Sequence, residues 1–163
     1  MRRTGSTTAL RWAAWGTGVT ALLHVAIIIG GPDWYRFFGA GEGMARLAAR
    51  GSLYPAVLTS GIAAVLGVAA LYGLSGAGLV RPLPALRPVL RLLAAVFLAR
   101  GVLGVPVVLL GSGSYILELR SRPVFMVVTS LVCLALGLAY GAGAGRSARA
   151  PVVLRDAPLR RTS

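Results

Sequence analysis

Four long apolar runs divide the chain, and shorter polar segments separate them. The runs cover residues 12–31, 53–80, 89–111 and 123–144. Each run is long enough to cross the hydrocarbon core of a bilayer as a helix, which takes about 20 residues. The alternation of about ten residues that is typical of outer-membrane strands does not recur. The pattern predicts an all-α integral membrane bundle of four transmembrane helices.

Composition supports this fold class and sets its limits. Hydrophobic residues make up 56% of the 163 residues, and the mean hydropathy of +0.78 is outside the range of soluble domains. Residues 146–163 contain Arg, Pro and Ser and no apolar run. We therefore expect a transmembrane domain over residues 1–145, followed by a flexible Arg-rich cytoplasmic tail over residues 146–163.

The arginines predict how the bundle is oriented. All 17 basic residues are Arg; eleven lie in the amino terminus, the second loop and the tail, and five lie in the first and third loops. Because basic residues concentrate on the cytoplasmic side, both termini should face the cytoplasm. The arginines form short clusters beside the apolar runs instead of one basic face, so nucleic acid is not an expected partner. The composition is typical of a GC-rich bacterial genome, which favours the inner membrane.

The segment between the first two runs is the most aromatic part of the chain. Residues 32–50 read "PDWYRFFGAGEGMARLAAR", and Trp34, Phe37 and Phe38 share one helical face. Glycines in the middle of the segment interrupt the helical pattern. We expect a cap of two short amphipathic helices, hinged at these glycines, on the outer side. The sequence leaves open whether this cap lies on the membrane surface or closes a cavity.

Arg100 is the sharpest chemical feature. It lies inside the third run, where an arginine near the bilayer centre costs about 2.5 to 3.5 kcal/mol. Such a residue should face the bundle interior or a wet cavity and pair with a carboxylate or with carbonyls. Two interpretations stay open: a buried salt bridge that fixes helix packing, or a site for a ligand, ion or substrate.

Three further residues are candidates for the same site. His24 lies in the first run at a depth about one helical turn from that of Arg100, so the two can line one pocket under the cap. The alternative for His24 is a packed, hydrogen-bonded side chain. Trp34 belongs to the cap, and Glu42 can pair either with Arg46, four residues on, or with Arg100.

The remaining polar residues have local explanations. Asp33 can cap a helical turn, and Glu118 lies close to Arg120 and Arg122. No metal or cofactor is expected, since His24 has no ligand at helical spacing and no nucleotide-binding motif occurs. The glycine pair Gly137 and Gly141 allows close helix packing, either within the chain or across a homo-oligomer or partner-subunit interface.

A family resemblance rests on three stretches together. A first helix containing His24 and followed by "GGPDWYRFFGAGE", the "GSLYP" that opens the second helix, and an arginine within the third resemble small four-helix proteins of bacterial inner membranes. The resemblance covers residues 12 to about 142. It implies the fold and the membrane, but no activity.

These observations favour a non-catalytic, multi-pass protein of the bacterial inner membrane. We expect it to bind a small anionic or amphipathic ligand, or a membrane lipid, in a pocket near Arg100 and His24, as a carrier or an accessory subunit. One alternative is a small membrane enzyme that acts on a lipid-like substrate with His24 as acid or base. The other is a structural partner of a larger membrane complex.

Overall fold

The computed structural model describes residues 4–146, and the regular structure of this part of the chain consists of helices only. In order these are α1 (Thr4–Gly30), α2 (Pro32–Phe37), α3 (Glu42–Ala49), α4 (Tyr54–Gly76), α5 (Leu86–Leu110), α6 (Ser114–Arg120) and α7 (Pro123–Arg146). Four of them, α1, α4, α5 and α7, are long and apolar enough to cross a membrane. The predicted all-α bundle of four transmembrane helices is confirmed. The predicted tail lies outside the described residues from residue 147 onward.

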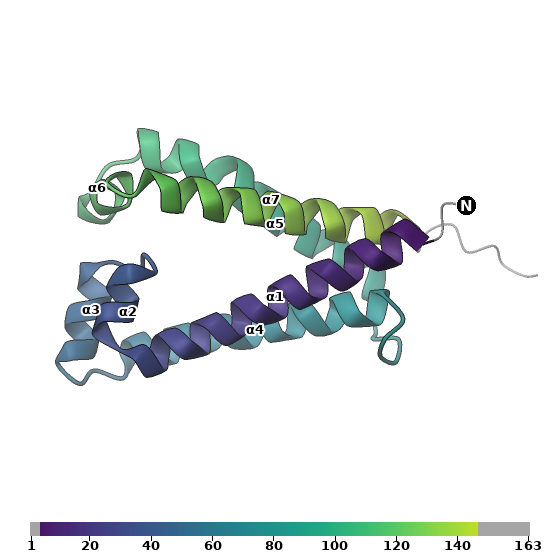
Figure 1. The fold of residues 1–163 in the computed structure, drawn as a ribbon, viewed down its shortest axis with the longest axis horizontal. Coiled ribbons are helices and arrows are strands. Elements are labelled where there is room, and N and C mark those ends of the chain that lie inside the picture. The colour runs from purple at the N-terminus through teal and green to yellow at the C-terminus, as the bar shows by residue number, and fades with distance from the viewer. Residues whose placement is uncertain (1–3, 147–163) are drawn as a thin grey trace, which may run out of the picture.

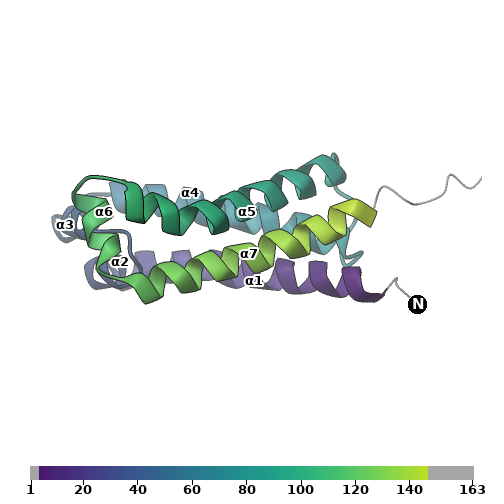
Figure 2. The same ribbon diagram turned by 90° about the horizontal axis from the view of Figure 1, so that it is seen from above.

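The four long helices form two pairs, α1 with α4 and α5 with α7. Figure 1 shows that the pairs meet at the end where α1 begins and α7 ends, and that they diverge toward α2, α3 and α6. Figure 2, turned by 90°, shows the helices running side by side along the same axis. We call the two ends of the bundle the terminal end and the cap end.

Tyr140 joins all four long helices at the terminal end. Its side chain is fully buried, and its hydroxyl oxygen lies 3.1 Å from Oγ1 of Thr17 in α1 and 3.1 Å from the carbonyl oxygen of Ala69 in α4. Its ring stacks on Phe97 of α5, with ring centroids 5.8 Å apart. The surrounding core contains Leu10, Ala13, Leu90, Ala94, Leu136 and Ala144. The pairs are therefore packed together where the apolar core is continuous.

Glycine permits the close approach of α5 and α7. A Cβ atom at Gly137 would lie 2.8 Å from Cγ of Leu98, and one at Gly101 would lie 2.6 Å from Cγ of Leu134. Gly141 faces Ala94 of the same helix α5. The Gly137 and Gly141 spacing thus serves packing within this chain.

The cap has the predicted organisation of two short helices broken by glycines. Gly39 and Gly41, between α2 and α3, have φ angles of 77° and 92°, which L side chains rarely adopt. The hairpin is attached to α1 through a small core that contains Ile27, Tyr35 and Ala45. The cap therefore packs on the α1 and α4 pair, whereas α6 lies at the cap end of the other pair (Figure 1).

Candidate functional site

The side chain of Arg100 runs along α5 toward the cap end. Arg100 lies ten residues before Leu110, the last residue of the helix, which corresponds to about 15 Å along the axis. A Cβ atom at Gly104, one turn further on, would overlap Nη1 of Arg100. The guanidinium thus occupies the space that the missing side chain of Gly104 provides.

Arg100 has no hydrogen-bond acceptor and no ion-pair partner among residues 4–146, and its side chain is exposed at the protein surface. The three described acids all have other partners. Asp33 and Glu42 pair with Arg36, and Glu118 accepts a hydrogen bond from the backbone of Glu42. The suggested contact between Glu42 and Arg100 is therefore not formed. Within the described chain, no salt bridge explains why an arginine lies in this span.

Ser130 of α7 lies beside the same glycine. Its Oγ atom would lie 2.8 Å from a Cβ atom at Gly104. The side chain is 4% exposed, and its hydroxyl has no hydrogen-bond partner in the described chain. Buried polar groups normally have partners, because leaving one unpaired costs about 1 to 3 kcal/mol. Two polar groups without a partner in the described chain, the guanidinium and this hydroxyl, thus lie beside one glycine.

A cavity of about 410 Å³ lies beside the guanidinium, between α5, α6 and the start of α7. Its walls are apolar apart from Arg100 and the ring of Tyr115, and include Leu103, Val107, Ile116, Leu119 and Met126. This volume lies within the range of small-molecule sites, about 300 to 1,000 Å³. The site therefore combines one cation with a hydrocarbon wall.

Tyr115 forms the boundary of this cavity toward the cap. Its hydroxyl donates a 3.0 Å hydrogen bond to the carbonyl oxygen of Gly39. Burial raises the pKa of the phenol above its ordinary value of 10.0, and the positive charge of Arg100 opposes that shift. The phenol consequently stays protonated and able to donate. Tyr115 also lines a second hollow of about 490 Å³ between α3 and α6, whose lining includes Glu42, Arg46 and Glu118, so Tyr115 lies between the two spaces.

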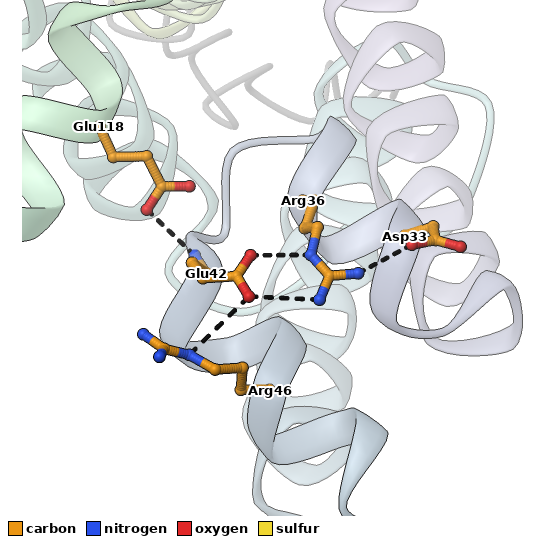
Figure 3. A network of polar contacts seen from close by, with 5 residues as sticks. All are labelled: Asp33, Arg36, Glu42, Arg46 and Glu118. Atoms are coloured by element: carbon orange, nitrogen blue, oxygen red, sulfur yellow. Dashed lines mark hydrogen bonds and ion pairs between the residues drawn. The ribbon is translucent and has the colours of Figure 1, made fainter.

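Arg36 holds the cap together (Figure 3). Its Nε and Nη2 atoms donate to the two carboxylate oxygens of Glu42 at 2.7 and 3.2 Å, and Nη1 donates to Asp33 at 2.8 Å. The hydrogen bond from Arg36 lowers the pKa of Glu42, and the same contact raises the pKa of Arg36. The predicted pair of Glu42 with Arg46 is present at 3.8 Å, but Arg36 is the closer partner.

Three polar contacts join the cap to the second helix pair. The backbone N–H of Glu42 donates to Oε2 of Glu118 at 3.0 Å, as Figure 3 shows. Arg122 donates to the carbonyl oxygen of Phe37 at 3.1 Å, and Tyr115 donates to Gly39 as described above. The expectation that Glu118 pairs with Arg120 and Arg122 is wrong, since both arginines bond to backbone carbonyls instead. The cap therefore bridges the diverging ends of the two pairs.

His24 and Trp34 lie apart from this cavity. The Nδ1 atom of His24 is 2.8 Å from the carbonyl oxygen of Thr20, so Nδ1 carries the proton. Leu10, Thr17 and His24 follow one another at seven-residue spacing and so share one face of α1. Nearer the terminal end, Leu10 and Thr17 on this face pack on α7. Trp34 is 42% exposed and packs on Phe38 in the cap. Neither residue lines the cavity that contains Arg100.

The structure instead brings Gly104, Ser130 and Tyr115 to Arg100, and the sequence analysis missed all three. Gly104 was detectable, because it follows Arg100 by four residues and so lies on the same helical face. The described residues contain no group of three His, Cys, Asp or Glu side chains arranged to hold a metal ion.

Comparison of the chain with protein-family models, curated proteins and solved structures found no match. The four spans identify a multi-pass membrane protein. Any more specific function has to be inferred from the site itself.

Proposed function

We propose that this membrane protein binds an anionic small molecule or lipid headgroup at Arg100, as a carrier or an accessory subunit. One observation carries the proposal: an arginine within a membrane span has no acceptor in the described chain and borders a cavity. Ionisable residues in spans are costly, and those that persist are commonly part of a ligand or ion site. A bound anion would supply the missing partner.

The chemistry of the donors suits an anion with two acceptor oxygens. A guanidinium presents a planar fork of N–H donors that matches a carboxylate or a phosphate group. Such contacts to a charged group are worth about 1.5 to 3 kcal/mol each, and the apolar wall would strengthen them by excluding water.

For the orientation, we propose that the terminal end faces the cytoplasm of a bacterial inner membrane. The support is the state of the arginines at the two ends. Those near the terminal end are exposed, and their side chains have no partner in the described chain: Arg11, Arg81, Arg87 and Arg91. Most of those at the cap end are bonded to carboxylates or carbonyls: Arg36, Arg46, Arg120 and Arg122. This contrast adds to the excess of arginines in the amino terminus, second loop and tail, eleven against five in the other two loops, which is the distribution expected of a cytoplasmic side.

The binding proposal can be tested by measuring whether the purified protein retains a ligand. The full chain would be released in a mild non-ionic detergent and examined by native mass spectrometry as wild type, Arg100→Gln and Arg91→Gln. Arg91 is a matched control, because it lies on the same helix, is exposed and has no described partner. We expect wild type and Arg91→Gln to retain an anionic species that Arg100→Gln loses at least tenfold. Equal retention by all three proteins would overturn the proposal.

A further inference from the structure

We infer that the ligand is a single-chain amphiphile whose headgroup carries one negative charge, such as a fatty-acid carboxylate or a phosphodiester. The inference rests on the proposed function, because it assigns a chemical class to the ligand of the same site. Three features of the cavity carry it: its charge, the arrangement of its donors, and the nature of its wall.

The charge of the cavity matches a monoanion. Arg100 is the only charged residue among those that line it. One bound negative charge neutralises the guanidinium, whereas a dianion would leave an uncompensated charge in an apolar setting, which is strongly unfavourable. The carboxylate of Glu118 lies on α6, the same short helix as Tyr115, and adds repulsion toward a second negative charge.

The donors select a headgroup with two equivalent oxygens. The guanidinium of Arg100 lines the cavity and presents a planar fork of N–H donors. A carboxylate and a phosphodiester each present two acceptor oxygens on one atom, so either can accept two hydrogen bonds from this fork. An uncharged alcohol has only one oxygen and leaves the guanidinium charge without a counterion.

The wall of the cavity suits one hydrocarbon chain. Leu103 and Val107 are 54% and 53% exposed on α5, so the apolar wall continues from the cavity onto the outer surface of the helix. A chain lying along this wall would bury apolar surface on one side and meet membrane lipid on the other. The volume of about 410 Å³ is near the lower end of the range for small-molecule sites, which favours one chain over two.

Competition binding with ligands of one chain length tests the assignment. The full chain in a non-ionic detergent at pH 8 would be titrated with dodecanoate, dodecyl methyl phosphate, dodecyl phosphate and dodecanol. We expect dodecanoate or dodecyl methyl phosphate to bind at least tenfold more tightly than the dianionic dodecyl phosphate and than dodecanol. Preference for dodecanoate identifies a free fatty acid as the source, and preference for the phosphodiester identifies a lipid headgroup.

Two variants distinguish a wrong ligand class from a wrong binding site. Arg100→Gln should weaken monoanion binding at least tenfold, and Gly104→Ala, whose methyl group would displace the guanidinium, should weaken it about tenfold even if Arg100→Gln does not fold. Binding that depends on these two residues but favours the dianion or the alcohol would overturn the inference and leave the proposed function standing. Binding that is unchanged in both variants would overturn both.

Discussion

The guanidinium of Arg100 lies over Gly104, in the space that any side chain at residue 104 would fill. This relationship explains how α5 tolerates an arginine within a span: the side chain extends along the helix toward the cap end and stays beside a cavity instead of pointing directly into lipid. It also means that the position of the charge depends on a residue that makes no polar contact itself.

Gly104→Ala should therefore displace the guanidinium and weaken anion binding about tenfold, with the helical content unchanged. The new methyl group would overlap Nη1 of Arg100 and approach Ser130. Gly67→Ala in α4 is the matched control, since a Cβ atom there meets nothing within 4 Å. Binding affinity and circular dichroism provide the two measurements. If Gly104→Ala acts through the arginine, the double variant with Arg100→Gln should bind the anion no more weakly than Arg100→Gln alone. Additive losses of affinity in the double variant would contradict this explanation.

Tyr140→Phe should destabilise the bundle by about 0.6 to 1.7 kcal/mol, the range measured for hydrogen bonds within membrane bundles. The change removes the hydroxyl that contacts Thr17 and the carbonyl of Ala69 but keeps the ring that stacks on Phe97. Unfolding in mixed micelles checks this, with the exposed Tyr54→Phe as a control. A double-mutant cycle with Thr17→Val should show coupling, and strict additivity would argue against the contact.

Glu42→Gln should lower the melting temperature in a pH-dependent way. Because its folded-state pKa lies below the ordinary value of about 4.5, the ionised Glu42 stabilises the cap fully above that pH. This contribution is lost as the pH falls through the lower folded-state value. The difference in melting temperature between wild type and Glu42→Gln should thus be constant from pH 5 to 8. It should shrink as the pH falls below about 4.5. A difference that does not shrink between pH 5 and pH 3 would exclude the ion pair with Arg36 as its cause.

Removing the contacts at the cap end should let the two helix pairs separate. In a double variant, Glu118→Ala removes the acceptor for the Glu42 N–H, and Arg122→Gln removes the guanidinium that donates to the Phe37 carbonyl. Spin labels at Leu47 and Leu117, in a Cys133→Ala background, should then report a broader and longer distance distribution. Arg50→Gln, which changes an exposed arginine without a described partner, should leave the distribution unchanged. An unchanged distribution in the double variant would show that other contacts hold the pairs.

The features that the sequence predicted correctly are those that local patterns determine. Run length and apolarity specify the four spans, and the glycines between Phe38 and Met44 specify the break in the cap. Even so, α1 begins at Thr4, because the polar turns before the apolar run continue the same helix. The seven residues of α6 were missed, since a helix this short inside a polar loop leaves no periodic apolar pattern.

The site was predicted only in part, because its geometry depends on how the helices face one another. The cost of a charge in a span was enough to identify Arg100. That Ser130 faces it follows from the packing of α5 on α7, which no local pattern reveals. Arg36 was missed as the partner of Glu42, because six residues across a glycine turn do not correspond to a helical contact spacing.

A bound amphiphile should lie in the cavity beside Arg100, and cross-linking can locate it. A monoanionic fatty acid with a photoreactive diazirine group in its chain would be cross-linked to the full protein and the attachment sites mapped by peptide mass spectrometry. We expect labels on Leu103, Ile116 and Met126, which line the Arg100 cavity, and the loss of these labels in Arg100→Gln. Labelling confined to the apolar groove between α1 and α4, around Leu22 and Ala64, and unaffected by that change, would contradict it.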